Sequence, residues 1–436
     1  MKTKAFQKDK VSVITLGCSK NLVDSEVMMA HLRDGGYDVA HDKWRKGRNI
    51  VIVNTCGFID KAKEESINTI LEYAEAKTAG KIEKLYVTGC LSQRYKDNLE
   101  EEIAEVDAFF GTAELPRLLK RFKIDYKQEL IGERMLSTPA HFAYLKISEG
   151  CNRTCSFCAI PLMRGKHISR TIESLVEEAR ALAAKGVKEL ILIAQELTYY
   201  GMDVYRKRKL PELLRALSDV DGIEWIRLHY AYPAQFPMEI IDEMAQNPKV
   251  CHYLDMPLQH AADDVLKTMR RNITREETEA LVQAIRAKIP DIAIRTTMLV
   301  GHPGETQEQF ESLLDFVKRM RFDRLGVFTY SHEEDTRAYG LEDTLTQEEK
   351  EARAAAVMAL QEGISMELNQ QRVGKVMRVL FDRKEGGWFI GRTAYDSPEV
   401  DNEVLVNAAD QYVRIGDFAN VRIVRAEEFD LYGEIV

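Results

Sequence analysis

Three cysteines stand close together in the segment SEGCNRTCSFCAIPLMRG, at Cys151, Cys155 and Cys158. Thiolates are the soft ligands that iron–sulfur clusters require, and three of them bind three irons of a four-iron cubane. The fourth iron then has no protein ligand, so it is open to a substrate or a cofactor. A structural zinc site would use four protein ligands, and no fourth is apparent here. The spacing therefore predicts a 4Fe–4S cluster with one open iron.

Three more cysteines each follow a short apolar run. Cys18, Cys56 and Cys90 come after VSVITL, NIVIVN and KLYVTG, which have the composition of buried parallel strands. Because the loops after parallel strands emerge at one edge of a sheet, we expect the three thiols to converge. A lone free cysteine is more often a small buried hydrophobe. We interpret the seventh cysteine, Cys251, in that way, as a structural thiol at the start of a strand.

The elements that must position these thiols fall into three regions. Residues 1–125 alternate apolar runs with amphipathic stretches such as 24–36, whose two glycines mark a helix end, which predicts a doubly wound α/β domain with a parallel sheet. Residues 138–370 hold about six further strand–helix units, too few for an eight-stranded barrel, and predict an open, partial (β/α)6 barrel. Residues 371–436 are β-rich with Gly, Asp, Asn and Pro between the runs, which predicts a small antiparallel β-barrel. The strand candidates of the second region are residues 142–148, 188–195, 224–230, 251–259, 292–301 and 324–331.

Composition narrows the class of protein. No apolar run approaches the roughly 20 residues of a membrane span, and the first ten residues, MKTKAFQKDK, do not resemble a signal peptide, so we expect a cytoplasmic protein. Seven cysteines are few and odd in number for a disulfide framework, which favours metal ligands. The net charge of −9 argues against a nucleic-acid partner and suits a basic protein partner.

The motif CNRTCSFC resembles the signature of the radical S-adenosylmethionine enzymes. In that family the open iron binds S-adenosylmethionine, and one electron from the cluster cleaves the sulfonium to a 5′-deoxyadenosyl radical. With the strand-end cysteines and the terminal barrel, the chain is similar over essentially its whole length to the methylthiotransferases. That resemblance implies that Cys18, Cys56 and Cys90 bind a second 4Fe–4S cluster, which holds the sulfur to be inserted. It also implies that the terminal barrel is a TRAM domain that grips a macromolecular substrate.

The methylthiotransferases have two branches, and three stretches resemble the ribosomal-protein branch (the RimO type). LGCSKNLVDSE, NTCGFI and CSFCAIPLMRGKHISR match it, whereas the tRNA branch reads closer to GCQMN and CTYCIVPYTRG. From residue 372 onward the chain has nine Lys and Arg against twelve Asp and Glu. A barrel that grips phosphates should be basic, while a basic ribosomal protein prefers an acidic surface.

The resemblance to the ribosomal branch implies a substrate and a set of partners. The substrate is the β-carbon of an aspartate in a basic loop of a small-subunit ribosomal protein, modified with two S-adenosylmethionine molecules per turnover. A low-potential electron donor such as flavodoxin or ferredoxin is expected, with no membrane and no nucleic acid except through the ribosome. Two alternatives stay open. They are methylthiolation of isopentenyl-adenosine in tRNA and a non-catalytic iron–sulfur electron carrier.

Several other residues are candidates for binding S-adenosylmethionine. Gln195 and Arg295 lie at predicted strand ends on the side of the site, although a polar residue also commonly ends a strand. Gly301, in GHPGET, resembles the glycine-containing loop of the family near the adenosine, and it is equally suited to a turn. His260 either lines the site or is a hydrogen-bonded structural histidine.

Overall fold

The computed structural model describes residues 9–43, 47–127 and 133–436. Most of the first ten residues, which were predicted not to form a signal peptide, and residues 128–132, between the first two predicted regions, lie outside the described residues. No helix among those described is long and apolar enough to cross a membrane.

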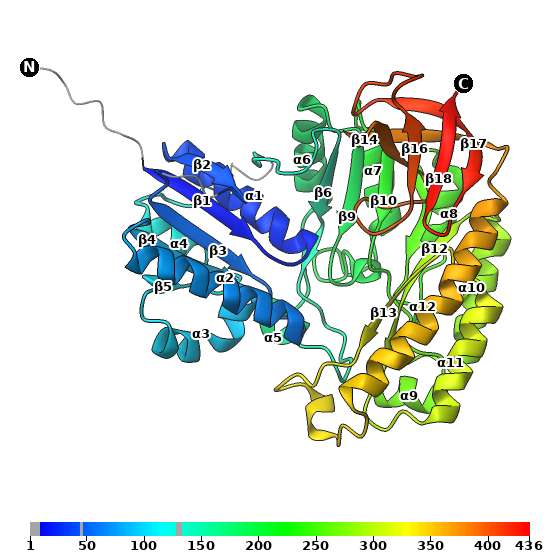
Figure 1. Ribbon diagram of the computed structural model, residues 1–436, viewed down its shortest axis with the longest axis horizontal. Helices are drawn as coiled ribbons and strands as arrows, with labels where there is room; N and C mark the ends of the chain where they lie inside the picture. The colour runs from blue at the N-terminus through cyan, green and yellow to red at the C-terminus, as the bar shows by residue number, and fades with distance from the viewer. Residues whose placement is uncertain (1–8, 44–46, 128–132) are drawn as a thin grey trace, which may run out of the picture.

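The N-terminal domain is a five-stranded parallel sheet covered by helices (Figure 1), as the βαβ pattern predicts. The strand order is β2-β1-β3-β4-β5. Its strands are β1 (Lys10–Thr15), β2 (Asp38–His41), β3 (Ile50–Thr55), β4 (Lys84–Gly89) and β5 (Ala108–Phe109), and its helices are α1 (Ser19–Asp34), α2 (Asp60–Thr78), α3 (Cys90–Glu102) and α4 (Leu115–Arg121). The sequence did not predict β2, because this short edge strand is only partly buried and has no apolar run.

The second domain is a six-stranded, all-parallel open barrel, which confirms the partial barrel predicted from the sequence. Its strand order is β13-β12-β11-β10-β9-β6. The strands are β6 (Phe142–Lys146), β9 (Glu189–Ile193), β10 (Trp225–Leu228), β11 (Val250–Asp255), β12 (Ala293–Val300) and β13 (Arg324–Thr329). The outer helices are α6 (Ile172–Ala184), α7 (Leu210–Ser218), α8 (Glu239–Gln246), α10 (Arg275–Lys288) and α11 (Gln307–Met320), and they share one large apolar core with the strands. The shorter elements are β7 (Ser148–Glu149), α5 (Ile160–Arg164), β8 (Ile168–Ser169), η2 (Leu197–Tyr199), α9 (Asp263–Thr268) and η3 (Arg337–Gly340).

A long helix, α12 (Gln347–Gln370), leads to a closed five-stranded barrel at the C-terminus. Its strands are β14 (Val376–Glu385), β15 (Trp388–Thr393), β16 (Glu403–Asn407), β17 (Phe418–Ala426) and β18 (Asp430–Ile435). The predicted small β-barrel is confirmed. One of its strand pairs, β16 with β18, is parallel, so the barrel is not purely antiparallel.

The concave face of the open barrel is closed by residues 394–402, which join β15 to β16. Residues two apart along a strand point to the same face of the sheet. Arg227 and His229 are two apart, and both bind residues 394–402. Arg227 donates to the carbonyl of Ala394, and His229 hydrogen-bonds to Ser397 Oγ at 2.8 Å. Three more contacts come from the neighbouring strands: Tyr253 to Asp401, Arg295 to Asp401 and Arg324 to Asp396. The terminal barrel therefore contributes polar groups to the interior of the second domain.

Candidate functional site

Three neighbouring strand-to-helix connections at the carboxyl edge of the N-terminal sheet carry Cys18, Cys56 and Cys90, and Cys90 is already the first residue of α3. A Cβ atom on Gly17 would lie 2.6 Å from Cβ and 2.8 Å from Sγ of Cys56, so the first two loops touch. A Cβ on Gly57 would come within 2.8 Å of Leu91 and 3.1 Å of the carbonyl carbon of Cys90, so the second and third touch as well. Only glycine permits these approaches. The structure thus brings the three predicted residues together.

Burial governs the acidity of the two inner thiols. Cys18 is exposed, whereas Cys56 and Cys90 are buried. Burial raises the pKa of the Cys56 thiol, and it raises the pKa of Cys90 to about 12, against the favourable charge of Arg164. Both are therefore protonated at neutral pH without metal. A metal that binds them must release their protons.

The other three predicted thiols lie on the loop between β7 and α5. The backbone N–H of Arg153 donates to Cys151 Sγ at 3.4 Å, and that of Cys158 donates to the carbonyl of Cys155 at 3.3 Å. Burial raises the pKa of Cys151 to about 11 and that of Cys158 to about 12. Arg271, on the loop after α9, donates from Nη1 to Cys155 Sγ at 3.4 Å.

Both cysteine sets fit an iron–sulfur cluster better than a single ion. Among the described residues, no three His, Cys, Asp or Glu side chains converge as ligands of one metal ion. A four-iron cubane takes one thiolate on each iron, so its ligands point at different atoms and need not converge. The two sets of three soft donors suit two cubanes in which the protein binds three of the four irons.

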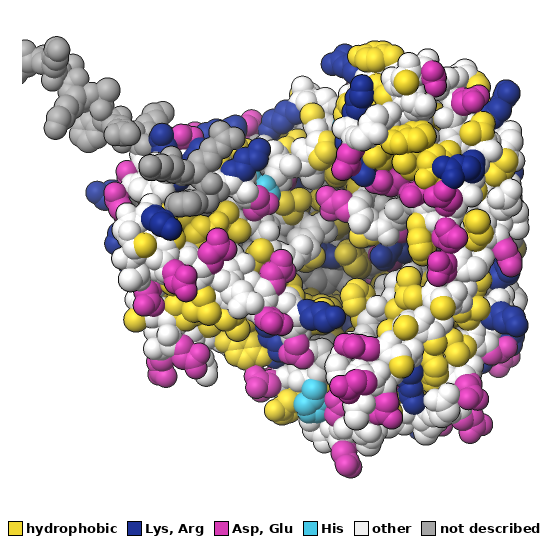
Figure 2. Space-filling model, viewed as in Figure 1, with side chains coloured by type: hydrophobic (Ala, Val, Ile, Leu, Met, Phe, Trp, Pro, Cys, Tyr) yellow, Lys and Arg dark blue, Asp and Glu magenta, His cyan; other side chains and the backbone are white. Residues whose placement is uncertain are grey.

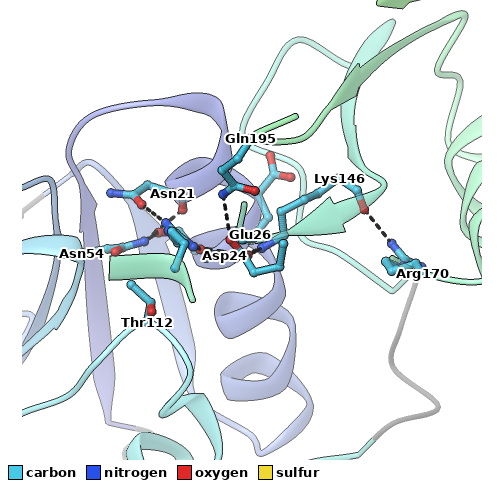
Figure 3. A network of polar contacts seen from close by, with 12 residues as sticks. Asn21, Asp24, Glu26, Asn54, Thr112, Lys146, Arg170 and Gln195 are labelled. Atoms are coloured by element: carbon cyan, nitrogen blue, oxygen red, sulfur yellow. Dashed lines mark hydrogen bonds and ion pairs between the residues drawn. The ribbon is translucent and has the colours of Figure 1, made fainter. Parts of the chain in front are cut away.

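A network of polar contacts around Asp24, Lys146 and Gln195 crosses the domain boundary between the two sets (Figure 3). Asp24, on α1, accepts from Lys146 at the end of β6 and from Arg164 of α5, the latter at 2.6 Å. Lys146 also reaches Glu149 at 2.6 Å, and Gln195 Nε2 donates to Glu149 at 2.8 Å. Burial alone would raise the pKa of Asp24, but the two cations lower it, so the carboxylate stays charged. Charge pairing therefore fixes the position of one thiol set relative to the other.

Three further predicted residues have partners of their own. Gln195 binds Glu149, and its Oε1 is buried without a partner among the described residues. Arg295 pairs with Asp255 at 3.3 Å and with Asp401 at 3.2 Å. Gly301 has a φ of +76°. Its N–H donates to Glu305 at 2.7 Å. Their contact with S-adenosylmethionine stays a prediction.

His260 and Cys251 are the remaining candidates from the sequence. His260 Nδ1 accepts from the N–H of Ala262 at 3.0 Å, and its Nε2 lies 3.6 Å from Glu305, which favours the structural interpretation. Cys251 is buried against Trp225 and Tyr253, and burial raises its pKa to about 11, as expected of an inert thiol.

The sequence did not indicate several residues of this region. Lys20 and Tyr230 face each other across the domain boundary, with Lys20 Nζ 3.1 Å from the ring centroid. The only signal for Lys20 was its place two residues after Cys18. Asp401 and Arg271 carried no signal, because Arg295 and Cys155, which they contact in the site, lie more than 100 residues away in the chain.

Comparison with known proteins places these regions in families. Residues 10–111 match "Uncharacterized protein family UPF0004", residues 145–317 match the "Radical SAM superfamily", and residues 373–436 match the "TRAM domain". The chain is 62% identical over 436 residues to a protein of Cytophaga hutchinsonii named "Ribosomal protein uS12 methylthiotransferase RimO", with 100% of both chains covered. Proteins of the same name from Flavobacterium johnsoniae and Bacteroides fragilis are 59% identical, with 100% of both chains covered, and 52% identical, with 99% of this chain and 100% of the relative covered.

A solved structure of similar fold is the radical S-adenosylmethionine methyltransferase TsrM from Kitasatospora setae. The match has a TM-score of 0.54 at 16% identity, and it covers 88% of this chain and 81% of that one. At this identity the likeness concerns the fold alone.

Proposed function

The chain belongs to the ribosomal protein uS12 methylthiotransferase family, and from this premise we propose that it attaches a methylthio group to the β-carbon of an aspartate of uS12. It is a radical S-adenosylmethionine methylthiotransferase, and its cofactors are S-adenosylmethionine and two 4Fe–4S clusters. In this proposal Cys151, Cys155 and Cys158 hold one cluster, and Cys18, Cys56 and Cys90 hold the other.

The chemistry requires both cofactor sites close together. An unactivated C–H bond beside an ionised carboxylate is a poor target for a general base. When bound, one cluster supplies the electron that cleaves S-adenosylmethionine, and the other supplies the sulfur. The chain's own residues position these groups and shield them from water. The pairing of Asp24 with Lys146 and Arg164 is the observation that supports this arrangement most strongly, since it joins the two thiol sets.

We also propose the partners that the function needs. Electrons come from a low-potential donor such as flavodoxin or ferredoxin. The contact with uS12 is made without direct nucleic-acid binding, which the excess of acidic over basic residues from residue 372 onward supports.

Mass analysis of ribosomal proteins tests the function. Cells without the gene should lack the mass of one methylthio group on a single aspartate-containing peptide of uS12, and the wild-type gene should restore it. A gene carrying Cys151→Ala should not. If the uS12 mass is unchanged in the deletion strain and the methylthio group is lost from tRNA adenosine instead, the chain modifies tRNA and the proposed function is wrong.

A further inference from the structure

Lys20 is a buried lysine whose ammonium has no hydrogen-bonded or ion-paired anion among the described residues. It is the second residue of α1 and is 7% exposed. Among the residues that the structure describes, no oxygen lies within hydrogen-bond or ion-pair distance of its Nζ, which rests only on the ring of Tyr230. Buried lysines are almost always paired, because an unpaired buried charge is costly. The missing partner therefore indicates that an anionic ligand binds here.

The ammonium lies where the two domains meet, close to the sulfur-side thiols, which are Cys18, Cys56 and Cys90. Lys20 is two residues from Cys18, and Tyr230 follows β10 of the open barrel. Tyr230 has a φ of +66°, a left-handed conformation that is strained for a tyrosine and is often found at functional sites. Its backbone N–H donates to Asp255 at 3.2 Å, which holds the backbone in this conformation.

The nearby carboxylates are already engaged elsewhere. Asp255 accepts from Arg295 and from the N–H of Tyr230. Asp24 and Glu149 pair with Lys146 and Arg164. Apart from Cys18, whose thiol the proposed cluster engages, the ammonium of Lys20 is thus left for an anion that arrives from outside the chain.

We propose that Lys20 binds the side-chain carboxylate of the substrate aspartate. The inference rests on the proposed function, which brings one aspartate of uS12 to this junction. Because the β-carbon is bonded directly to the carboxyl carbon, a fixed carboxylate also fixes the reacting carbon beside the sulfur-side thiols. Lys20 is therefore a substrate-binding residue that selects aspartate over neutral isosteres.

Binding of two forms of uS12 to the reconstituted holoenzyme tests this role. The first is the natural protein, and the second carries asparagine at the target aspartate. A charge-assisted hydrogen bond corresponds to about 10- to 100-fold in affinity, so the wild-type enzyme should bind the first form more tightly by that factor. Lys20→Met keeps the contact with Tyr230 but removes the charge. It should weaken binding of the natural form by the same factor and leave binding of the asparagine form within about twofold.

Lys249→Met is the matched control. Lys249 Nζ donates to the carbonyl of Ser218 at 2.6 Å, at the opposite end of β11, so this variant should keep the wild-type preference. Iron content and binding of S-adenosylmethionine are measured for each variant. If Lys20→Met fails to bind iron, Lys20→Gln replaces it, and the ratio between the two uS12 forms is read there.

The outcomes separate the two proposals. Equal affinity of the wild-type enzyme for the two forms overturns the role of Lys20 without any variant. So does a preference that persists in Lys20→Met, or in Lys20→Gln where this variant replaces it, even when affinity for both forms falls alike. A wild-type enzyme that neither binds nor methylthiolates natural uS12 contradicts the proposed function itself.

Discussion

At the residue scale, the thiols of the open-barrel loop lie beside a stack of two guanidinium groups on one ring. Arg153 and Arg271 lie 4.0 and 4.3 Å from the centroid of Tyr232. Tyr232 Oη donates to the carbonyl of Arg271 at 2.6 Å, and Arg271 Nη2 donates to that of Pro257 at 2.5 Å. These contacts fix the guanidinium that donates to Cys155 Sγ. The guanidinium can therefore act on the cluster that this thiol binds.

We expect Arg271→Met to lower the reduction potential of that cluster. An N–H···S hydrogen bond stabilises the reduced, more negative state, and losing about 1.4 kcal/mol of it corresponds to roughly 60 mV for one electron. The potential is measured by a redox titration followed by electron paramagnetic resonance, in a background of Cys18→Ala, Cys56→Ala and Cys90→Ala. Arg286→Met, on an outer helix, serves as control. An unchanged or higher potential in Arg271→Met would contradict this role.

The cysteines could be predicted at this scale, whereas their supporting residues could not. A C-x3-C-x2-C spacing is typical of few kinds of site, and the end of a strand can be predicted from the end of an apolar run. Lys20 and Arg271 act through contacts with Tyr230 and Cys155 that only the folded chain creates. A single basic residue in a sequence does not reveal such a partner.

At the element scale, residues 394–402 are the feature that the sequence concealed. Their Pro, Asp and Asn residues predicted a turn, which is correct locally. The turn also inserts Asp396 between Arg324 and Arg372, at 2.9 Å from Arg324 Nε and 3.9 Å from Arg372. Burial would raise the pKa of Asp396, but the two guanidinium groups lower it, so a charged carboxylate joins the terminal barrel to the open barrel.

Asp396→Ala should lower the free energy of unfolding by about 3–5 kcal/mol, because it leaves buried guanidinium groups without their counter-charge. Chemical denaturation of the holoenzyme measures this loss. Asp410→Ala, at an exposed turn of the same barrel, should change the free energy of unfolding by less than about 0.5 kcal/mol. A loss in Asp396→Ala no larger than in this control would show that the segment is not a structural link.

The strands themselves were predictable because each buried strand is an apolar run between turn signals. The six strands of the open barrel and the main strands of the N-terminal sheet follow this rule, whereas β17 and β18 of the terminal barrel fall within one β-rich run, residues 419–436, that the sequence did not divide. The edge strand β2 escaped it, since a partly exposed strand needs no apolar run.

At the scale of the whole molecule, ion pairs hold the N-terminal domain against the open barrel on both sides of their junction. Besides Asp24, the buried Glu333 accepts from Lys63 at 3.0 Å and from Arg94 at 2.7 Å. The surface is hollowed where the two domains meet (Figure 2). No sequence pattern predicts this docking, because the partners are more than 120 residues apart in the chain. The docking nevertheless decides whether the two thiol sets can serve one substrate.

The iron content of two triple variants tests that joint role most directly. Cys18→Ala/Cys56→Ala/Cys90→Ala should bind about half the iron of the wild-type protein, still form 5′-deoxyadenosine from S-adenosylmethionine, and add no methylthio group to uS12. Cys151→Ala/Cys155→Ala/Cys158→Ala should also bind about half the iron and should form no 5′-deoxyadenosine. Full iron content in the first variant, or continued methylthiolation of uS12 by it, would contradict the account.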